Sequence, residues 1–274
     1  MLAWLIEHTP TFSQIPKPFG VFHLLFLGGI LILFVLMVVF RHHLPKSPVA
    51  VQTILMIFGI GLLLLEIGKQ LVYSYDPAVG WAYNWEKFPF QFCSTPIYVA
   101  LVAMCLKKCQ CKDALLAFLA TYSPVAGASV LFYPAPSVFS NIVFLNVHTM
   151  VWHGAMLLFG LYLWLSGAVV PTWQTAWRSF WVYLPLNGVA LALNELSYAT
   201  GFAGEYAFNM FYIGRYGKCL IPVLSQIQAK APYAVFFLSY VITLGMGGFL
   251  VTLAMKILHN KKFQKTFKKL LTNR

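Results

Sequence analysis

A cysteine near the start of an apolar stretch stands in a context that could make it a nucleophile. Cys93 lies within "FPFQFCSTPIYVALVAM", which is apolar enough to sit in lipid. Pro89 is suited to the first turn of a helix, which would put Cys93 near the helix N-terminus. There the partial positive charge of the helix stabilises the thiolate, which is the reactive form of cysteine.

Polar residues crowd around this cysteine and suggest how a reaction at it could be supported. Gln91, Ser94 and Thr95 could donate hydrogen bonds to the oxyanion that develops when a thiolate attacks a carbonyl group. Pro96 has no backbone N–H, so it would loosen the turn that holds Cys93. The alternative is that Cys93 is one more small packing residue, since cysteine is common at buried positions.

A nucleophilic cysteine needs a base, and the stretch "NVHTMVWHG" offers two histidines. His148 and His153 are five residues apart, or about 140° around a helix, so they cannot both face one point squarely. Counting residues from the inner ends of the predicted spans puts His153 at the depth of Cys93, whereas counting from the outer ends favours His148. The spacing alone leaves the choice open.

The elements that must position these residues are membrane helices. The chain has 274 residues, 60% of them hydrophobic and 9% charged, and its mean hydropathy is +0.75. Soluble domains carry roughly a quarter of charged residues, and the apolar stretches here are of transmembrane length. We predict an all-α polytopic protein of the cell membrane with about seven transmembrane helices. The predicted spans cover residues 20–40, 50–73, 88–106, 114–132, 141–166, 178–199 and 232–257.

The distribution of positive charge predicts the orientation of these spans. Basic residues occur in the 41–48 and 107–113 loops, whereas the 75–87 and 133–140 loops hold one lysine between them. Because cytoplasmic loops are enriched in Lys and Arg, we expect the N-terminus outside and the C-terminus in the cytoplasm. The long 200–231 loop is also basic, but long loops weigh little in this rule.

The two ends of the chain have distinct predicted roles. Residues 1–19 are expected to form an interfacial lead-in to a membrane domain that covers residues 20–257. The formal net charge of +12 is concentrated behind the last span, in a basic amphipathic tail over residues 258–274. Such a tail is expected to lie on an anionic cytoplasmic leaflet, with partner docking as the alternative, and we expect no nucleic-acid binding.

Ionisable residues at membrane depth are costly and usually face a cavity or a partner. His23, Glu66, Lys69 and Glu195 fall in the outer halves of their predicted spans, which predicts a polar cavity open toward the outer face or the outer leaflet. Glu66 and Lys69 are spaced i,i+3 and could simply neutralise each other. Glu195 follows Asn194 near a helix end, where a solvated or network role is an alternative to catalysis.

The two motifs together resemble a known family. "FPFQFCSTPIYVAL" followed by "VWHGAMLLFGLYLW" looks like the bacterial YwaF-type membrane proteins, which group with the animal transmembrane protein 164 family. The resemblance covers most of the chain, including "ELSYATGFAGEYAFNMFYIGRYG". It implies a fold similar to that of membrane lipid hydrolases with a threonine–histidine dyad. It also implies acyl transfer onto lysophospholipid, with Cys93 matching the nucleophile, His153 matching the histidine, and no clear counterpart for His148.

We therefore expect an integral membrane lipid acyltransferase or transacylase, or an acyl hydrolase if water replaces the acceptor. His153 would deprotonate Cys93, the thiolate would attack a lipid ester, and a lysolipid hydroxyl would then attack the acyl-thioester. The expected partners are membrane phospholipids or lysophospholipids. Neither a metal nor another cofactor is expected, because the cysteines lack further ligands at suitable spacing.

The polar residues within the predicted spans are compatible with more than one function. The polar residues expected to support substrate binding are Gln91, Ser94, Thr95, His148, Glu66, Lys69, Asn194 and Glu195. In a small-solute or proton-coupled transporter, Glu66, Lys69 and Glu195 would instead line a transport path, although no internal repeat is visible. A receptor-like sensor is a third possibility.

Overall fold

Long apolar helices account for most of the chain. The computed structural model describes residues 1–135, 138–204 and 208–259. Short 3-10 helices are labelled η. The elements are α1 (Leu2–Glu7), α2 (Val21–Val39), α3 (Pro48–Tyr73), β1 (Tyr75–Asp76), β2 (Gly80–Trp81), η1 (Trp85–Lys87), η2 (Phe92–Ser94), α4 (Thr95–Cys105), α5 (Gln110–Phe132), α6 (Val143–Leu165), α7 (Trp173–Thr200), η4 (Met210–Tyr212), α8 (Leu224–Lys230) and α9 (Tyr233–Leu258).

Within the described residues, five helices are long and apolar enough to cross a membrane, namely α2, α3, α5, α6 and α9. This confirms a helical membrane protein. Helix α7 has 28 residues but is less apolar. Helix α4 has 11 residues and is about 16 Å long, which is short of the roughly 30 Å hydrocarbon core. The count of seven spans, the orientation and the placement in the cell membrane stay predictions.

The third predicted span begins differently from expectation. The chain forms η2 at Phe92–Ser94, and α4 starts at Thr95 with Pro96 in its first turn. The prediction that Pro89 opens this helix is therefore wrong, and so is the prediction that Pro96 loosens a turn within it. Proline is tolerated in the first turn because an N–H there has no intrahelical partner to lose.

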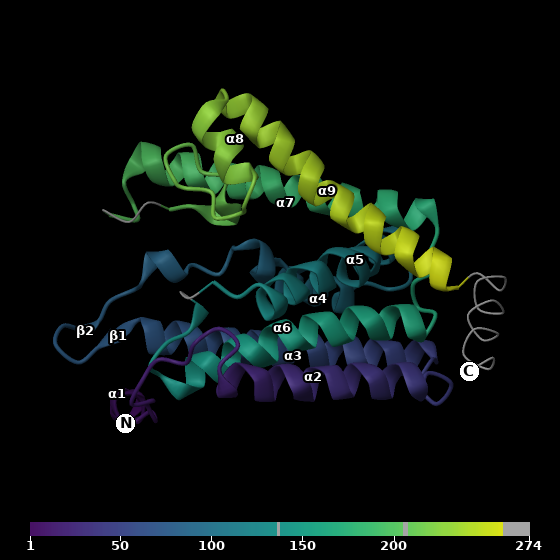
Figure 1. Cartoon of the computed structure of the whole chain (residues 1–274), viewed down its shortest axis with the longest axis horizontal. Coiled ribbons are helices and arrows are strands. Elements are labelled where there is room, and N and C mark those ends of the chain that lie inside the picture. Colours follow the sequence, from purple (N-terminus) through teal and green to yellow (C-terminus); the bar gives the residue numbers. More distant parts are fainter. Residues whose placement is uncertain (136–137, 205–207, 260–274) are drawn as a thin grey trace.

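The helices lie roughly along one axis, in layers (Figure 1). Helices α2, α3 and α6 form one side, α4 and α5 lie in the middle, and α7 and α9 form the other side. The chain enters the bundle at the end that carries α1 and the β1–β2 hairpin, and α9 ends at the opposite end. The predicted lead-in is tied to the chain before α6, where Thr11 pairs with Ile142 and the Phe12 N–H donates to the Asn141 carbonyl (2.7 Å). The basic tail, from residue 260 on, lies outside the described residues.

Helices α5 and α6 approach each other closely at two glycines. A Cβ atom on Gly127 would lie 2.5 Å from the carbonyl oxygen of His153, and one on Gly160 would lie 2.7 Å from Cγ of Pro124. Small residues allow such close packing between membrane helices. The histidines of α6 are thus carried on a helix whose distance from α5 is tightly set.

Candidate functional site

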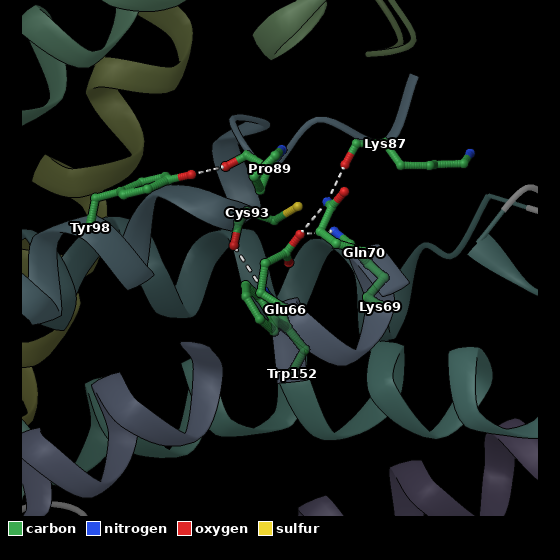
Figure 2. A network of polar contacts seen from close by, with 8 residues as sticks. All are labelled: Glu66, Lys69, Gln70, Lys87, Pro89, Cys93, Tyr98 and Trp152. Atoms are coloured by element: carbon green, nitrogen blue, oxygen red, sulfur yellow. Dashed lines mark hydrogen bonds and ion pairs between the residues drawn. The ribbon is translucent and has the colours of Figure 1, made fainter. Parts of the chain in front are cut away.

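Cys93 sits in η2, between α3 and α6. It is partly buried, and its carbonyl oxygen accepts a hydrogen bond from Nε1 of Trp152 on α6 (2.9 Å). Its sulfur points toward Glu66 and Gln70 of α3 (Figure 2). The turn is therefore fixed through its backbone on one side, while the thiol faces a polar patch on the other.

That polar patch is built by three residues on one side of α3. Glu66, which is only 5% exposed, accepts at Oε1 from Nζ of Lys69 (2.7 Å) and from Nε2 of Gln70 (2.7 Å). Gln70 Nε2 also lies 2.7 Å from the carbonyl of Lys87, as Figure 2 shows. The predicted ion pair between Glu66 and Lys69 is confirmed. Glu66 Oε2 and Gln70 Oε1 are buried and have no hydrogen-bond partner among the described residues.

The two α6 histidines are both buried, and each has an Nε2 atom without a hydrogen-bond partner in the described part of the chain. Nδ1 of His153 lies 2.7 Å from the carbonyl oxygen of Thr149. Because a carbonyl can only accept, Nδ1 must carry the proton, so Nε2 of the neutral ring presents its basic lone pair. His148 stacks on Trp152, with ring centroids 5.1 Å apart, and so shares the face of α6 that meets Cys93.

By contrast, the third membrane histidine is fully bonded. His23 accepts from the Phe19 N–H at Nδ1 (2.9 Å) and donates from Nε2 to the Leu131 carbonyl (3.0 Å). It is a structural link between α2 and α5. Only His148 and His153 therefore keep capacity for chemistry among the histidines predicted at membrane depth.

The charge of Lys69 reaches all three groups that could form a nucleophile and its base. It lies close enough to interact electrostatically with Cys93, His148 and His153. Burial of the thiol and the Glu66 carboxylate oppose the thiolate, and the Lys69 cation favours it. Glu66, toward which the Cys93 sulfur points, and its ion-pair partner Lys69 therefore lie beside the turn that holds Cys93.

Two of the three predicted oxyanion donors beside Cys93, Gln91 and Thr95, have other partners in this arrangement. Gln91 donates from Nε2 to the Asn209 carbonyl (2.9 Å) and accepts at Oε1 from the Phe211 N–H (2.9 Å). Thr95 donates from Oγ1 to the Phe92 carbonyl (2.8 Å). Ser94 is buried. Gln91 therefore acts by holding η4 against η2.

A second amide holds η4 from the opposite side. Asn194 of α7 accepts from the Met210 N–H (2.6 Å) and donates to the Met210 carbonyl (3.0 Å). The clamped segment contains Phe211 and Tyr212, whose φ values of 59° and 58° are costly for residues with side chains. Glu195 does not join this group: its carboxylate lies 3.6 Å from Arg215, and both side chains are largely exposed.

Three parts of the site escaped the sequence analysis. Gln70 follows Glu66 by four residues and Trp152 follows His148 by four, so helical spacing was a signal that could have found both. The contact of Gln91 with Asn209 joins residues 118 positions apart and has no local signal. In the part of the chain that the structure describes, no group of three or more His, Cys, Asp or Glu residues could hold a metal ion.

Comparison with known proteins adds one finding. A model of the TMEM164 family matches residues 18–262, which include Cys93, both α6 histidines and the α7 amide. No curated protein and no solved structure matches the chain. The matched segment is nearly the whole sequence, so the chain belongs to the TMEM164 family.

Proposed function

We propose that this membrane protein is a lipid acyltransferase or transacylase in which Cys93 carries the acyl group. The observation that supports this most directly is the surroundings of the thiol. It lies in a turn fixed by Trp152 and near the charge of Lys69, and Trp152 is carried by α6, whose two buried histidines each have an Nε2 atom without a hydrogen-bond partner among the described residues. Such a constellation is what nucleophilic catalysis through cysteine requires.

The first half of the proposed reaction forms the acyl-enzyme. Nε2 of His153 takes the proton of the Cys93 thiol, and the thiolate attacks the carbonyl carbon of a lipid ester. The C–S bond forms, the C–O bond of the ester breaks, and the imidazolium returns its proton to the departing alkoxide. The products are a lysolipid and an acyl-thioester on Cys93.

The second half transfers the acyl group onward. The hydroxyl oxygen of an acceptor lysolipid attacks the thioester carbon while its proton passes to His153. The new C–O bond forms, the C–S bond breaks, and the thiolate of Cys93 regains the proton from the imidazolium. If water attacks in place of the hydroxyl, the same groups release a free fatty acid.

The proposal is tested directly by detecting the acyl group on Cys93. Purified protein reconstituted with phospholipid is examined by intact-protein mass spectrometry, and we expect an acyl adduct in the wild type but not in Cys93→Ala. Cys219→Ala is the matched control, because that thiol is also buried but packs in a separate cluster with Ala190 and Phe236. An adduct that persists in Cys93→Ala would refute the proposal.

The choice of base is tested by two parallel variants. General-base catalysis contributes roughly 10²–10⁴-fold, so His153→Gln should slow adduct formation by about that factor. His148→Gln should slow it less, because His148 enters the proposal only through its stacking on Trp152. The reverse order of effects would assign the base to His148.

A further inference from the structure

A groove runs between α3 and α4 and ends beside the candidate site. It has a volume of about 460 Å³, within the range of small-molecule sites, and most of its lining is apolar. Leu63 and Leu101 line it, while Ser74 directly follows α3, Trp81 lies in β2 and Tyr83 follows β2. We call it the α3–α4 groove.

The rim of the α3–α4 groove is suited to contact with lipid chains. Ile67 lines the groove and is 47% exposed, and its neighbours Leu64 and Val102 are 64% and 51% exposed. Trp and Tyr side chains prefer the level of the lipid headgroups, which matches the Trp81 and Tyr83 end. A lipid could therefore enter sideways from the bilayer, with its polar end near the hairpin.

The polar atoms of this groove specify part of what it binds. Glu66 and Gln70 line it, and each has one buried oxygen without a hydrogen-bond partner among the described residues; these oxygens, Glu66 Oε2 and Gln70 Oε1, are both acceptors. A buried acceptor without a donor destabilises the fold, and more so when it is charged. The missing group is therefore a donor, such as a hydroxyl, carried by a molecule that is otherwise apolar.

We propose that the α3–α4 groove is the acceptor subsite and that it binds a single-chain lipid with a free hydroxyl group. The chain lies along Leu63 and Leu101, and the hydroxyl reaches past the groove surface to donate to the buried, unpartnered oxygens of Glu66 and Gln70. The sulfur of Cys93 points toward these same two residues, as Figure 2 shows, so the hydroxyl oxygen would lie beside an acyl-thioester on that sulfur. This inference rests on the proposed function.

A second apolar groove of similar volume serves as a control for lipid binding to the α3–α4 groove. It has a volume of about 420 Å³ and lies between α2, α3 and α6, where its lining includes Gly61, Leu158 and Phe159. Its lining residues include none of the unpartnered acceptors of the site. It lacks the feature that would recognise a hydroxyl, so it serves as the control surface.

The test measures binding without turnover, in the Cys93→Ala protein. The protein is reconstituted in phosphatidylcholine nanodiscs with lysophosphatidylcholine that carries a diazirine at the chain end, and cross-linked peptides are mapped after illumination. We expect labels on residues of α3 and α4 that line the α3–α4 groove. Leu101→Trp should reduce this labelling at least tenfold, and Leu158→Trp in the second groove should not. Leu71→Trp blocks the α3–α4 groove from the α3 side, in case Leu101→Trp does not fold.

Recognition of the hydroxyl is tested by competition. Unlabelled lysophosphatidylcholine should compete at least tenfold better than an analogue of equal chain length with hydrogen in place of the free hydroxyl. A hydrogen bond to a charged group is worth about 1.5–3 kcal/mol, and 1.4 kcal/mol is a tenfold change in affinity. Equal competition by the two lipids, or labelling confined to the second groove, would overturn the inference.

The two proposals can fail separately. An acyl adduct on Cys93 without hydroxyl-dependent labelling of the α3–α4 groove would leave the proposed function intact and reject the acceptor subsite. Hydroxyl-dependent labelling without any acyl adduct would reject acyl transfer, and with it the role of the groove as an acceptor subsite.

Discussion

Replacing Gly127 with alanine tests whether the α5–α6 contact positions the α6 histidine. The added Cβ would lie 2.5 Å from the carbonyl oxygen of His153 and 3.1 Å from Cβ of Met156. Ordinary contacts begin near 3.4 Å, so α6 must move away by about 0.9 Å at His153. The atoms in the way are backbone atoms of His153 and Leu157 and the Cβ of Met156, so no flexible side chain can absorb the shift.

The size of the effect follows from this displacement. A misplacement of 1 Å can cost about 10²-fold in rate, so we expect adduct formation at Cys93 to slow roughly 10- to 100-fold in Gly127→Ala. Overpacking costs typically about 1–3 kcal/mol, against a gain of about 1 kcal/mol from the better helix former, so stability should fall modestly. The rate loss should therefore exceed what partial unfolding explains.

Gly188→Ala is the matched control. Gly188 lies within α7, and a Cβ there would meet no atom within 4 Å. Both variants are compared with the wild type in the same detergent, by thermal melting and by the rate of acyl-adduct formation in the mass spectrometer. Gly188→Ala should retain the wild-type rate. A rate for Gly127→Ala within twofold of the wild type would refute the argument that this packing contact positions His153.

Two further variants test other supports of the site. Trp152→Phe leaves the Cys93 carbonyl without its donor, which costs about 1–3 kcal/mol of stability, so the melting temperature should fall and the loosened turn should slow adduct formation roughly tenfold; a wild-type rate would contradict this. Gln91→Leu removes both hydrogen bonds that tie η4 to η2, so limited proteolysis at residues 209–212 should become faster. Asn194→Leu should act in the same direction from the α7 side, and unchanged protection in both would show that the amides do not hold this segment.

Local patterns in the sequence were enough to predict much of the helical scaffold. The five membrane-length helices fall within or close to predicted spans. A run of about twenty apolar residues in lipid must satisfy its backbone hydrogen bonds internally, and a helix does this. The pairing of Glu66 with Lys69 followed from their spacing alone. Family membership, suggested by the Cys93 and His153 motifs, is confirmed by the match over residues 18–262.

What the sequence could not predict depends on tertiary contacts. Pro89 and Pro96 both suit a first helical turn, and only the packing of η2 decides that the helix starts at Thr95. The partners of Gln91 at η4 are far away in the sequence. The local pattern therefore predicted an oxyanion donor, whereas in the structure the side chain holds η4 against η2. The transporter reading grouped Glu195 with Glu66, but the structure pairs Glu195 with Arg215 instead.

Buried polar atoms without hydrogen-bond partners on α3 and α6, within the described residues, are a physical reason to expect substrate binding between these helices. Glu66 Oε2, Gln70 Oε1, His148 Nε2 and His153 Nε2 all lack partners among the described residues. Each such atom costs about 1–3 kcal/mol, which is a large fraction of the net stability of a typical domain. A purely structural role for Glu66 would need only the ion pair with Lys69, which uses Oε1 alone. The remaining oxygens and basic nitrogens can each accept a hydrogen bond from a hydroxyl or a thiol. Their lack of partners is explained if a bound substrate supplies these hydrogen bonds and the histidines take part in proton transfer.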